Sequence, residues 1–163
     1  MRYADTPTAE VEIVVDAPID RLWALITDIE LPARFSSEFR GAEWLDAGPA
    51  LDARFKGRNE HAAIGAWEVT CVVTQCEVDR VFEWAVGDAD DASAKWRFEL
   101  EPSAHGVLLR QWCQIGPAPS GLTAAIMAMP DKEERIVGRR LEEFRTNMQA
   151  TVEGIKRVAE TTP

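Results

Sequence analysis

The stretch Lys-Trp-Arg-Phe-Glu-Leu-Glu at residues 95–101 decides the fold, because apolar and charged side chains alternate along it without a break. Successive side chains of a β-strand point to opposite faces, so this alternation predicts a strand with one dry face and one solvated face. Phe82, Trp84 and Val86 alternate with Glu83 in the same way one segment earlier. We therefore predict a sheet that gathers large aromatic side chains on one face.

Further short segments have strand character, and turn-forming residues separate them. The predicted strands are residues 11–15, 42–45, 51–56, 67–78, 81–87, 95–101 and 107–115. The links at 79–80, 87–92 and 102–106 are short enough for hairpins, which join antiparallel neighbours. Gly57-Arg58-Asn59 is interpreted as another turn, because Gly tolerates positive φ and Asn can bond its own backbone.

Helical patterns flank the strands. Asp16-Ala17-Pro18 has the chemistry of a helix start, and we expect that helix to end near Asp28, before a second short helical piece at 31–39. A long helix is predicted after Pro130, with an apolar stripe spaced by three and four. The stripe is Val137, Leu141, Phe144, Met148, Val152, Ile155 and Val158. The pattern predicts an α+β fold with a curved antiparallel sheet of about six to seven strands around this helix.

Length and charge narrow the function. The 163 residues, 46% of them apolar, predict a single domain over 1–163 with its core at about 9–159. Eighteen basic and 28 acidic residues give a formal charge of -10, which disfavours nucleic acid and anionic membranes as partners. Without an apolar leader or spanning segment, we expect a cytoplasmic monomer or homodimer with no membrane insertion.

Several motifs resemble a known family in order and spacing. They are residues 17–28 (Ala-Pro-Ile-Asp-Arg-Leu-Trp-Ala-Leu-Ile-Thr-Asp), 55–59, 67–73, 96–102 and 106–109. They resemble the polyketide cyclase/dehydrase branch of the START-related helix-grip superfamily, also called SRPBCC or Bet v 1-like, over about residues 9–159. The resemblance implies a deep cavity between the sheet and the last helix, with the two short helices after the first strand.

The candidate ligand-binding residues are the large or polar side chains expected around such a cavity. They are Phe55, Asn59, Trp67, Cys71, Trp84, Trp96, Gln111, Cys113, Met127, Leu141 and Phe144. Gln111 shares its strand phase with Leu109 and Cys113, and a buried amide requires a hydrogen-bond partner from protein, water or ligand. The resembling family often has an acidic residue there, and because Gln cannot ionise, general-base catalysis from this position is not expected.

Candidates for catalysis are His61 and Arg58, which could assist proton transfer or stabilise an enolate if they faced the cavity. The alternative is that both belong to a structural turn. No metal and no cofactor are predicted, because two histidines and three cysteines form no ligand motif. Cys71, Cys76 and Cys113 fit reduced core thiols.

Three functions remain open from the sequence. The first is binding of a small hydrophobic molecule that is lipid-like, aromatic or polyketide-like. The second is a polyketide cyclase, aromatase or dehydratase that folds its substrate in the cavity. The third is a protein-interaction module whose six tryptophans fill the core. The Met-rich segment 116–130 is either a lid or wall of the cavity, or ordinary packing beneath the last helix.

Overall fold

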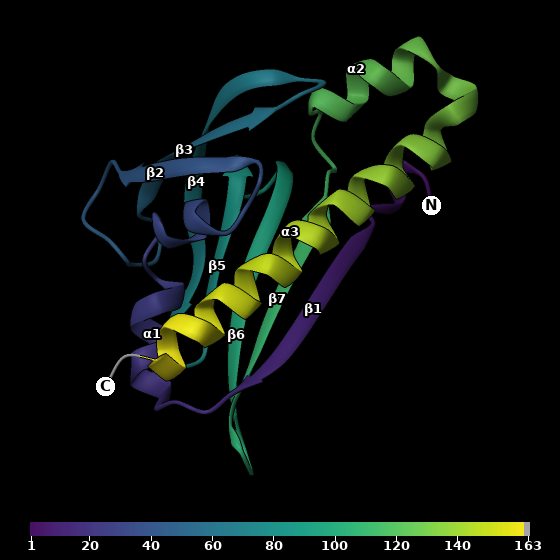
Figure 1. Cartoon of the computed structure of the whole chain (residues 1–163). Helices are drawn as coiled ribbons and strands as arrows, with labels where there is room; N and C mark the ends of the chain where they lie inside the picture. The colour runs from purple at the N-terminus through teal and green to yellow at the C-terminus, as the bar shows by residue number, and fades with distance from the viewer. Residues whose placement is uncertain (162–163) are drawn as a thin grey trace.

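In the computed structural model, which describes residues 1–161, one curved antiparallel sheet of seven strands wraps around a long helix (Figure 1). The strands are β1 (Thr8–Val15), β2 (Phe39–Trp44), β3 (Arg54–His61), β4 (Gly65–Glu77), β5 (Val81–Gly87), β6 (Ala92–Ser103) and β7 (Gly106–Ile115). Their order is β1-β7-β6-β5-β4-β3-β2, so β2 to β7 form successive hairpins and β1 closes against β7. The predicted helix-grip fold is confirmed.

Helices and short 3-10 turns complete the chain. They are η1 (Tyr3–Asp5), α1 (Ile19–Ile26), η2 (Leu31–Arg34), α2 (Gly121–Ala128), η3 (Pro130–Lys132) and α3 (Glu133–Thr161). In Figure 1, α3 runs diagonally across the concave face of the sheet, and α1 lies beside its C-terminal end. The 29 residues of α3 span about 44 Å at the usual rise per residue, and the helix packs mainly on β1 and β7.

Burial follows the two predicted periodicities. Along β5 and β6 the concave-face residues Phe82 and Phe98 are each at most 1% exposed, whereas Glu101 near the end of β6 is exposed. On α3, Val137 and Val152 of the predicted stripe are likewise buried against the sheet. Apolar burial on the facing surfaces of sheet and helix drives them together.

The predicted turn at Gly57-Arg58-Asn59 is wrong, because β3 runs straight through it. Gly57 pairs with Val69 of β4 and with Ala42 of β2, so its backbone is held from both sides. The reversal comes after His61 instead, where Gly65 takes φ +90°, a conformation that favours glycine. Ladder pairing on both edges outweighs the turn preference of the three residues.

The connection between β7 and α3 holds a helix that the Gly, Pro and Met content of 116–130 concealed. Ser120 caps α2, with its Oγ accepting from the N–H of Leu122 and its N–H donating to Thr123 Oγ1. Tyr3 Oη donates to the Ala118 carbonyl and fixes the approach to this cap. None of the helices formed by residues 1–161 combines the length and the apolar character needed to cross a membrane.

Candidate ligand-binding cavity

A cavity of about 560 Å³ lies between the concave face of the sheet and α3. Strands β3 to β7 form its floor, the segment from Ile26 to Phe39 forms one side, and the beginning of α2 contributes Ser120 to Leu122. Its volume falls within the roughly 300–1,000 Å³ usual for small-molecule sites. The tryptophans therefore leave this space open, and the alternative of a core filled by tryptophans gains no support from the cavity.

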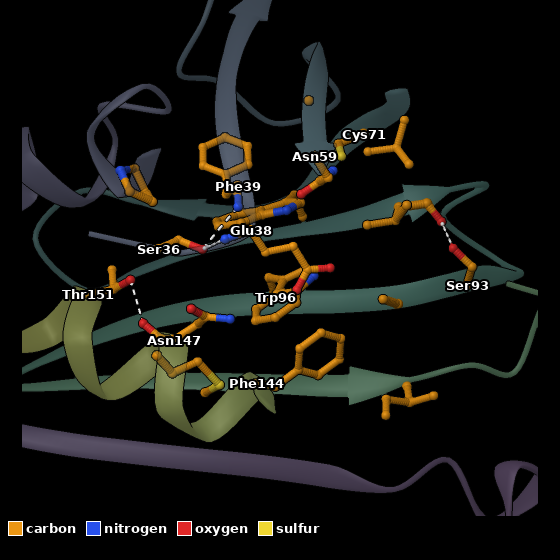
Figure 2. Close-up of a pocket in the computed structure, with 18 of the residues that line it drawn as sticks. Ser36, Glu38, Phe39, Asn59, Cys71, Ser93, Trp96, Phe144, Asn147 and Thr151 are labelled. Atoms are coloured by element: carbon orange, nitrogen blue, oxygen red, sulfur yellow. Dashed lines mark hydrogen bonds between the residues drawn. The ribbon is translucent and has the colours of Figure 1, made fainter. Parts of the chain in front are cut away.

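Aromatic side chains make most of the wall. The ring centroid of Trp84 on β5 lies 5.8 Å from that of Phe55 and 6.1 Å from that of Phe98. On the opposite side, Trp96 of β6 meets Phe144 of α3 edge to face, with centroids 4.9 Å apart (Figure 2). Such pairs hold flat apolar faces in fixed positions, so the cavity suits an apolar and ring-containing guest.

Eight of the eleven candidate ligand-binding residues line the cavity. They are Phe55, Asn59, Trp67, Cys71, Trp84, Trp96, Gln111 and Phe144. Alternation along the strands placed those on the sheet, and the α3 stripe placed Phe144. Their contact with a ligand stays a prediction.

Three candidates lie outside the cavity. Cys113 and Leu141 pack in a second core cluster with Ala9 and Val137, because α3 there sits directly on β1 and β7 and leaves no space. Met127 is 77% exposed on α2, which turns this side chain to solvent rather than toward the cavity. The structure therefore does not place these three residues in the cavity wall.

One side of the cavity wall is polar and was not predicted from the sequence. It comprises Ser36 and Glu38 before β2 and, on α3, Arg140, Asn147 and Thr151. The α3 residues lie at helical spacing on either side of Phe144, so widening the apolar stripe by one position would have found them. For Ser36 and Glu38, which precede a strand in an irregular link, the sequence carries no such signal.

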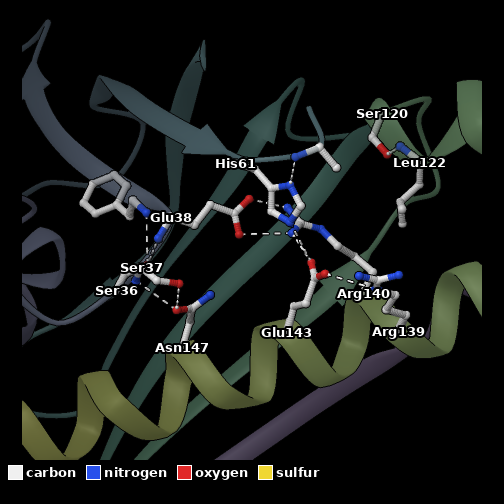
Figure 3. A network of polar contacts seen from close by, with 12 residues as sticks. Ser36, Ser37, Glu38, His61, Ser120, Leu122, Arg139, Arg140, Glu143 and Asn147 are labelled. Atoms are coloured by element: carbon white, nitrogen blue, oxygen red, sulfur yellow. Dashed lines mark hydrogen bonds and ion pairs between the residues drawn. The ribbon is translucent and has the colours of Figure 1, made fainter. Parts of the chain in front are cut away.

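An ionic network spans the polar side of the cavity (Figure 3). Arg140 Nη1 donates to Glu38 Oε2 at 3.0 Å and to Glu143 Oε2 at 2.8 Å, and a second bond joins Arg140 to Glu38. Burial lowers the pKa of Arg140, but the two carboxylates outweigh it and hold the pKa above its ordinary value. Glu38 itself is 8% exposed, so this ion pair ties the β2 entrance to α3 inside the protein.

His61 extends the same network at the end of β3. Its Nδ1 accepts from the N–H of Ala63 at 3.0 Å, so Nε2 carries the proton and donates to Glu143 Oε2 at 3.2 Å. Burial raises the pKa of Glu143, but Arg140 and His61 together lower it by more, so the net pKa is below its ordinary value. Both ring nitrogens of His61 are thus engaged, Nδ1 within the β3–β4 connection and Nε2 with α3.

Neither catalytic candidate is a lining residue of the cavity. Arg58 is exposed on the outer face of β3, where its guanidinium covers Gly41, because it alternates with the inward-facing Gly57. His61 contacts Glu143 of α3 instead. The roles proposed for them required side chains directed into the cavity, and the strand phase and the Glu143 contact oppose both.

Gln111 of β7 is the most unusual polar group of the wall. It is 5% exposed, it lines the cavity, and its Oε1 has no hydrogen-bond partner within residues 1–161. A buried acceptor left without a partner costs about 1–3 kcal/mol. This residue is therefore poorly explained by packing of the protein alone.

The cysteines provide no nucleophile. Burial raises the pKa of Cys71 to about 12, and also raises that of Cys113 to about 12 against a smaller opposing effect of the Ala9 backbone. Both are therefore thiols near neutral pH and poor nucleophiles. Across residues 1–161 the structure gathers no group of three His, Cys, Asp or Glu side chains able to hold a metal ion.

Comparison with known proteins gives the family. The family model described as polyketide cyclase / dehydrase and lipid transport matches residues 6–160, and the chain belongs to this family. The Polyketide_cyc-like protein Cgl2372 from Corynebacterium glutamicum is 31% identical, with a TM-score of 0.65 over 94% of this chain and 91% of that one. No curated protein matches the sequence significantly.

More distant structures share the fold. The di-domain ARO/CYC BexL from the BE-7585A biosynthetic pathway is 12% identical, with a TM-score of 0.74 over 96% of this chain and 51% of BexL. Ara h 8.0201 is 11% identical, with a TM-score of 0.60 over 96% of this chain and 99% of that one. At these identities the likeness establishes the helix-grip architecture alone.

Proposed function

We propose that this protein binds a small hydrophobic molecule, with aromatic or lipid-like character, in the cavity between the sheet and α3. The observation that carries the proposal is a preformed space of about 560 Å³ with aromatic walls, including Trp84, Trp96 and Phe144. An empty apolar cavity of this size costs stability in a protein that has no use for it. Membership of a family described by cyclase, dehydrase and lipid-transport roles supports the same reading.

Polyketide cyclase or dehydratase activity is the alternative function. The fold of BexL, an ARO/CYC protein, is compatible with it, but its low identity carries no residue role to this chain. Arg58 lies on the outer face and His61 is engaged with Glu143, so the side chains first considered for proton transfer offer it no support. Binding requires no proton-transfer group in the cavity, and it is the function that we propose.

Native mass spectrometry tests the proposal. The mass of the purified protein is measured under native and under denaturing conditions. An organic extract of the same sample is analysed in parallel. We expect an additional mass that leaves on unfolding. A sample without that mass, which also shows no thermal shift with a panel of hydrophobic and aromatic compounds, would contradict the proposal.

Adjacent positions of β3 supply a matched pair of variants. Gly57 lines the cavity, and a Cβ there would meet Val69 and Phe39 at ordinary contact distances of 3.5 and 3.6 Å, so Gly57→Leu extends a side chain into the space. Arg58→Leu places the same side chain on the outer face. The bound mass should be lost in the first variant and retained in the second. Equal retention in both would place the ligand elsewhere.

A further inference from the structure

The apolar cavity contains one deeply buried hydrogen-bond acceptor with nothing to accept. Gln111 is 5% exposed and lines the cavity, and its Oε1 is unpaired among the described residues. Its neighbours across the ladder are Phe98 on β6 and Val11 on β1, and Leu109 and Cys113 flank it on its own face of β7. These neighbours leave the amide oxygen in apolar surroundings.

Ordered water is a poor partner for this oxygen. A buried water is held by two to four polar groups, and none of the four side chains beside Gln111 carries an N–H or O–H group. The polar lining residues Ser36, Arg140 and Asn147 lie on other elements, Ser36 in the segment before β2 and the other two on α3. The missing hydrogen-bond donor for Gln111 Oε1 is consequently expected to come from a bound apolar molecule.

We infer that Gln111 Oε1 accepts a hydrogen bond from the ligand, which is therefore an apolar, ring-containing molecule with a hydroxyl or N–H donor at its buried end. This inference rests on the proposed function and names the ligand chemistry that the site selects. A charged donor is disfavoured, because the side chains that neighbour Gln111 on the sheet are apolar. Asn59 also lines the cavity, but it lies on β3 and not beside Gln111 on β7. The neutral donor of the ligand is therefore assigned to Gln111.

Three pyrene derivatives separate the possible contacts. 1-Hydroxypyrene can donate, 1-methoxypyrene can only accept, and 1-methylpyrene can do neither, while the ring system stays the same. Quenching of the tryptophan fluorescence measures the affinity of each. We expect wild type to bind 1-hydroxypyrene about tenfold more tightly than the other two, as one neutral hydrogen bond allows. The variant Gln111→Leu should bind all three alike.

A control variant and a second measurement distinguish ligand recognition by Gln111 from a purely structural role. Gln114 lies on the outer face of β7 and donates from Nε2 to the Gly116 carbonyl, so Gln114→Leu should leave the preference for 1-hydroxypyrene intact. Removal of an unpaired amide should raise the melting temperature of the ligand-free Gln111→Leu variant. A fall in that melting temperature with loss of all binding would indicate a structural role and overturn the inference.

The remaining outcomes separate this inference from the proposed function. If wild type binds the three pyrenes equally, the inference fails and hydrophobic binding stands. If 1-methoxypyrene binds as tightly as 1-hydroxypyrene, the amide presents its N–H to the ligand and the assignment of a donor is overturned. If no pyrene binds and native mass spectrometry finds no ligand, the proposed function and the inference both fail.

Discussion

The Cα of Gly154 on α3 lies directly beneath the ring of Phe35. A Cβ added at Gly154 would come within 2.4 Å of Phe35 Cδ1 and 2.5 Å of two further ring atoms. Because Phe35 immediately precedes Ser36 and lies close to Glu38, this contact positions the polar side of the cavity. A glycine within a long helix, usually a weakness, here allows the close approach.

Gly154→Ala should destabilise the protein although alanine favours helix. The gain of about 1 kcal/mol in helix propensity is outweighed by overpacking, which typically costs about 1–3 kcal/mol. Gly138 on the same helix is the control, since a Cβ there would meet nothing within 4 Å. Urea unfolding should give a lower free energy of unfolding for Gly154→Ala and a higher one for Gly138→Ala. A rise for both would show that Phe35 moves aside freely.

Phe144→Ala should weaken ligand binding strongly, because it removes the α3 partner of Trp96 from the cavity wall. Loss of an aromatic contact of this kind corresponds to roughly tenfold or more in the dissociation constant. Met127→Ala is the control, since Met127 is 77% exposed outside the cavity. Titration with a bound compound from the mass-spectrometry test measures both. Equal losses would place Met127 against the ligand.

Arg140→Met should cost more stability than Glu38→Gln. Removal of Arg140 leaves the buried Glu38 carboxylate without its counter-ion, and breaking a buried pair in this way costs about 3–5 kcal/mol. Removal of the Glu38 charge leaves Arg140 paired with Glu143 at 2.8 Å, so a smaller loss is expected. Chemical unfolding at neutral pH ranks the two variants, and the opposite ranking would show that the Glu38 charge is well solvated.

Acid should weaken the protein in part through Glu83 on the outer face of the sheet. Burial raises the pKa of Glu83, but hydrogen bonds from Arg97, Gln75 and Thr74 outweigh it and hold the pKa below its ordinary value. A carboxyl with a lowered folded-state pKa contributes stability above its unfolded pKa of about 4.3 and loses it as the pH falls through the folded value.

Glu83→Gln should therefore be less stable than wild type at pH 7, by about 1–3 kcal/mol, and should lose less stability below about pH 4. Glu101→Gln on the same face, where Glu101 is exposed, should behave as wild type. Urea unfolding between pH 7 and pH 3 measures the difference. Parallel curves for wild type and Glu83→Gln would mean that another carboxyl governs the acid limb.

Local patterns carried most of the architecture. Alternation in residues 95–101 and around Trp84 defines the concave face, and spacing by three and four on α3 defines the helix face that covers it. Both arise from the geometry of one element, so the sequence is sufficient to predict them. The turn expected at Gly57 failed because the pairing of β3 with β2 and β4 is a non-local interaction.

The sequence by itself determined the sheet, the helix and which side chains face inward, since backbone geometry converts residue order directly into faces. Only the tertiary structure decided where the inward faces of the sheet and of α3 are in contact and where a cavity lies between them. Close seating of α3 on β1 buries Cys113 and Leu141, whereas the same helix leaves open space over Trp84 and Trp96. It also decided that Arg140 pairs with Glu38 and that no group within residues 1–161 donates a hydrogen bond to Gln111 Oε1. Such outcomes depend on the distance between elements, which packing of the whole chain sets.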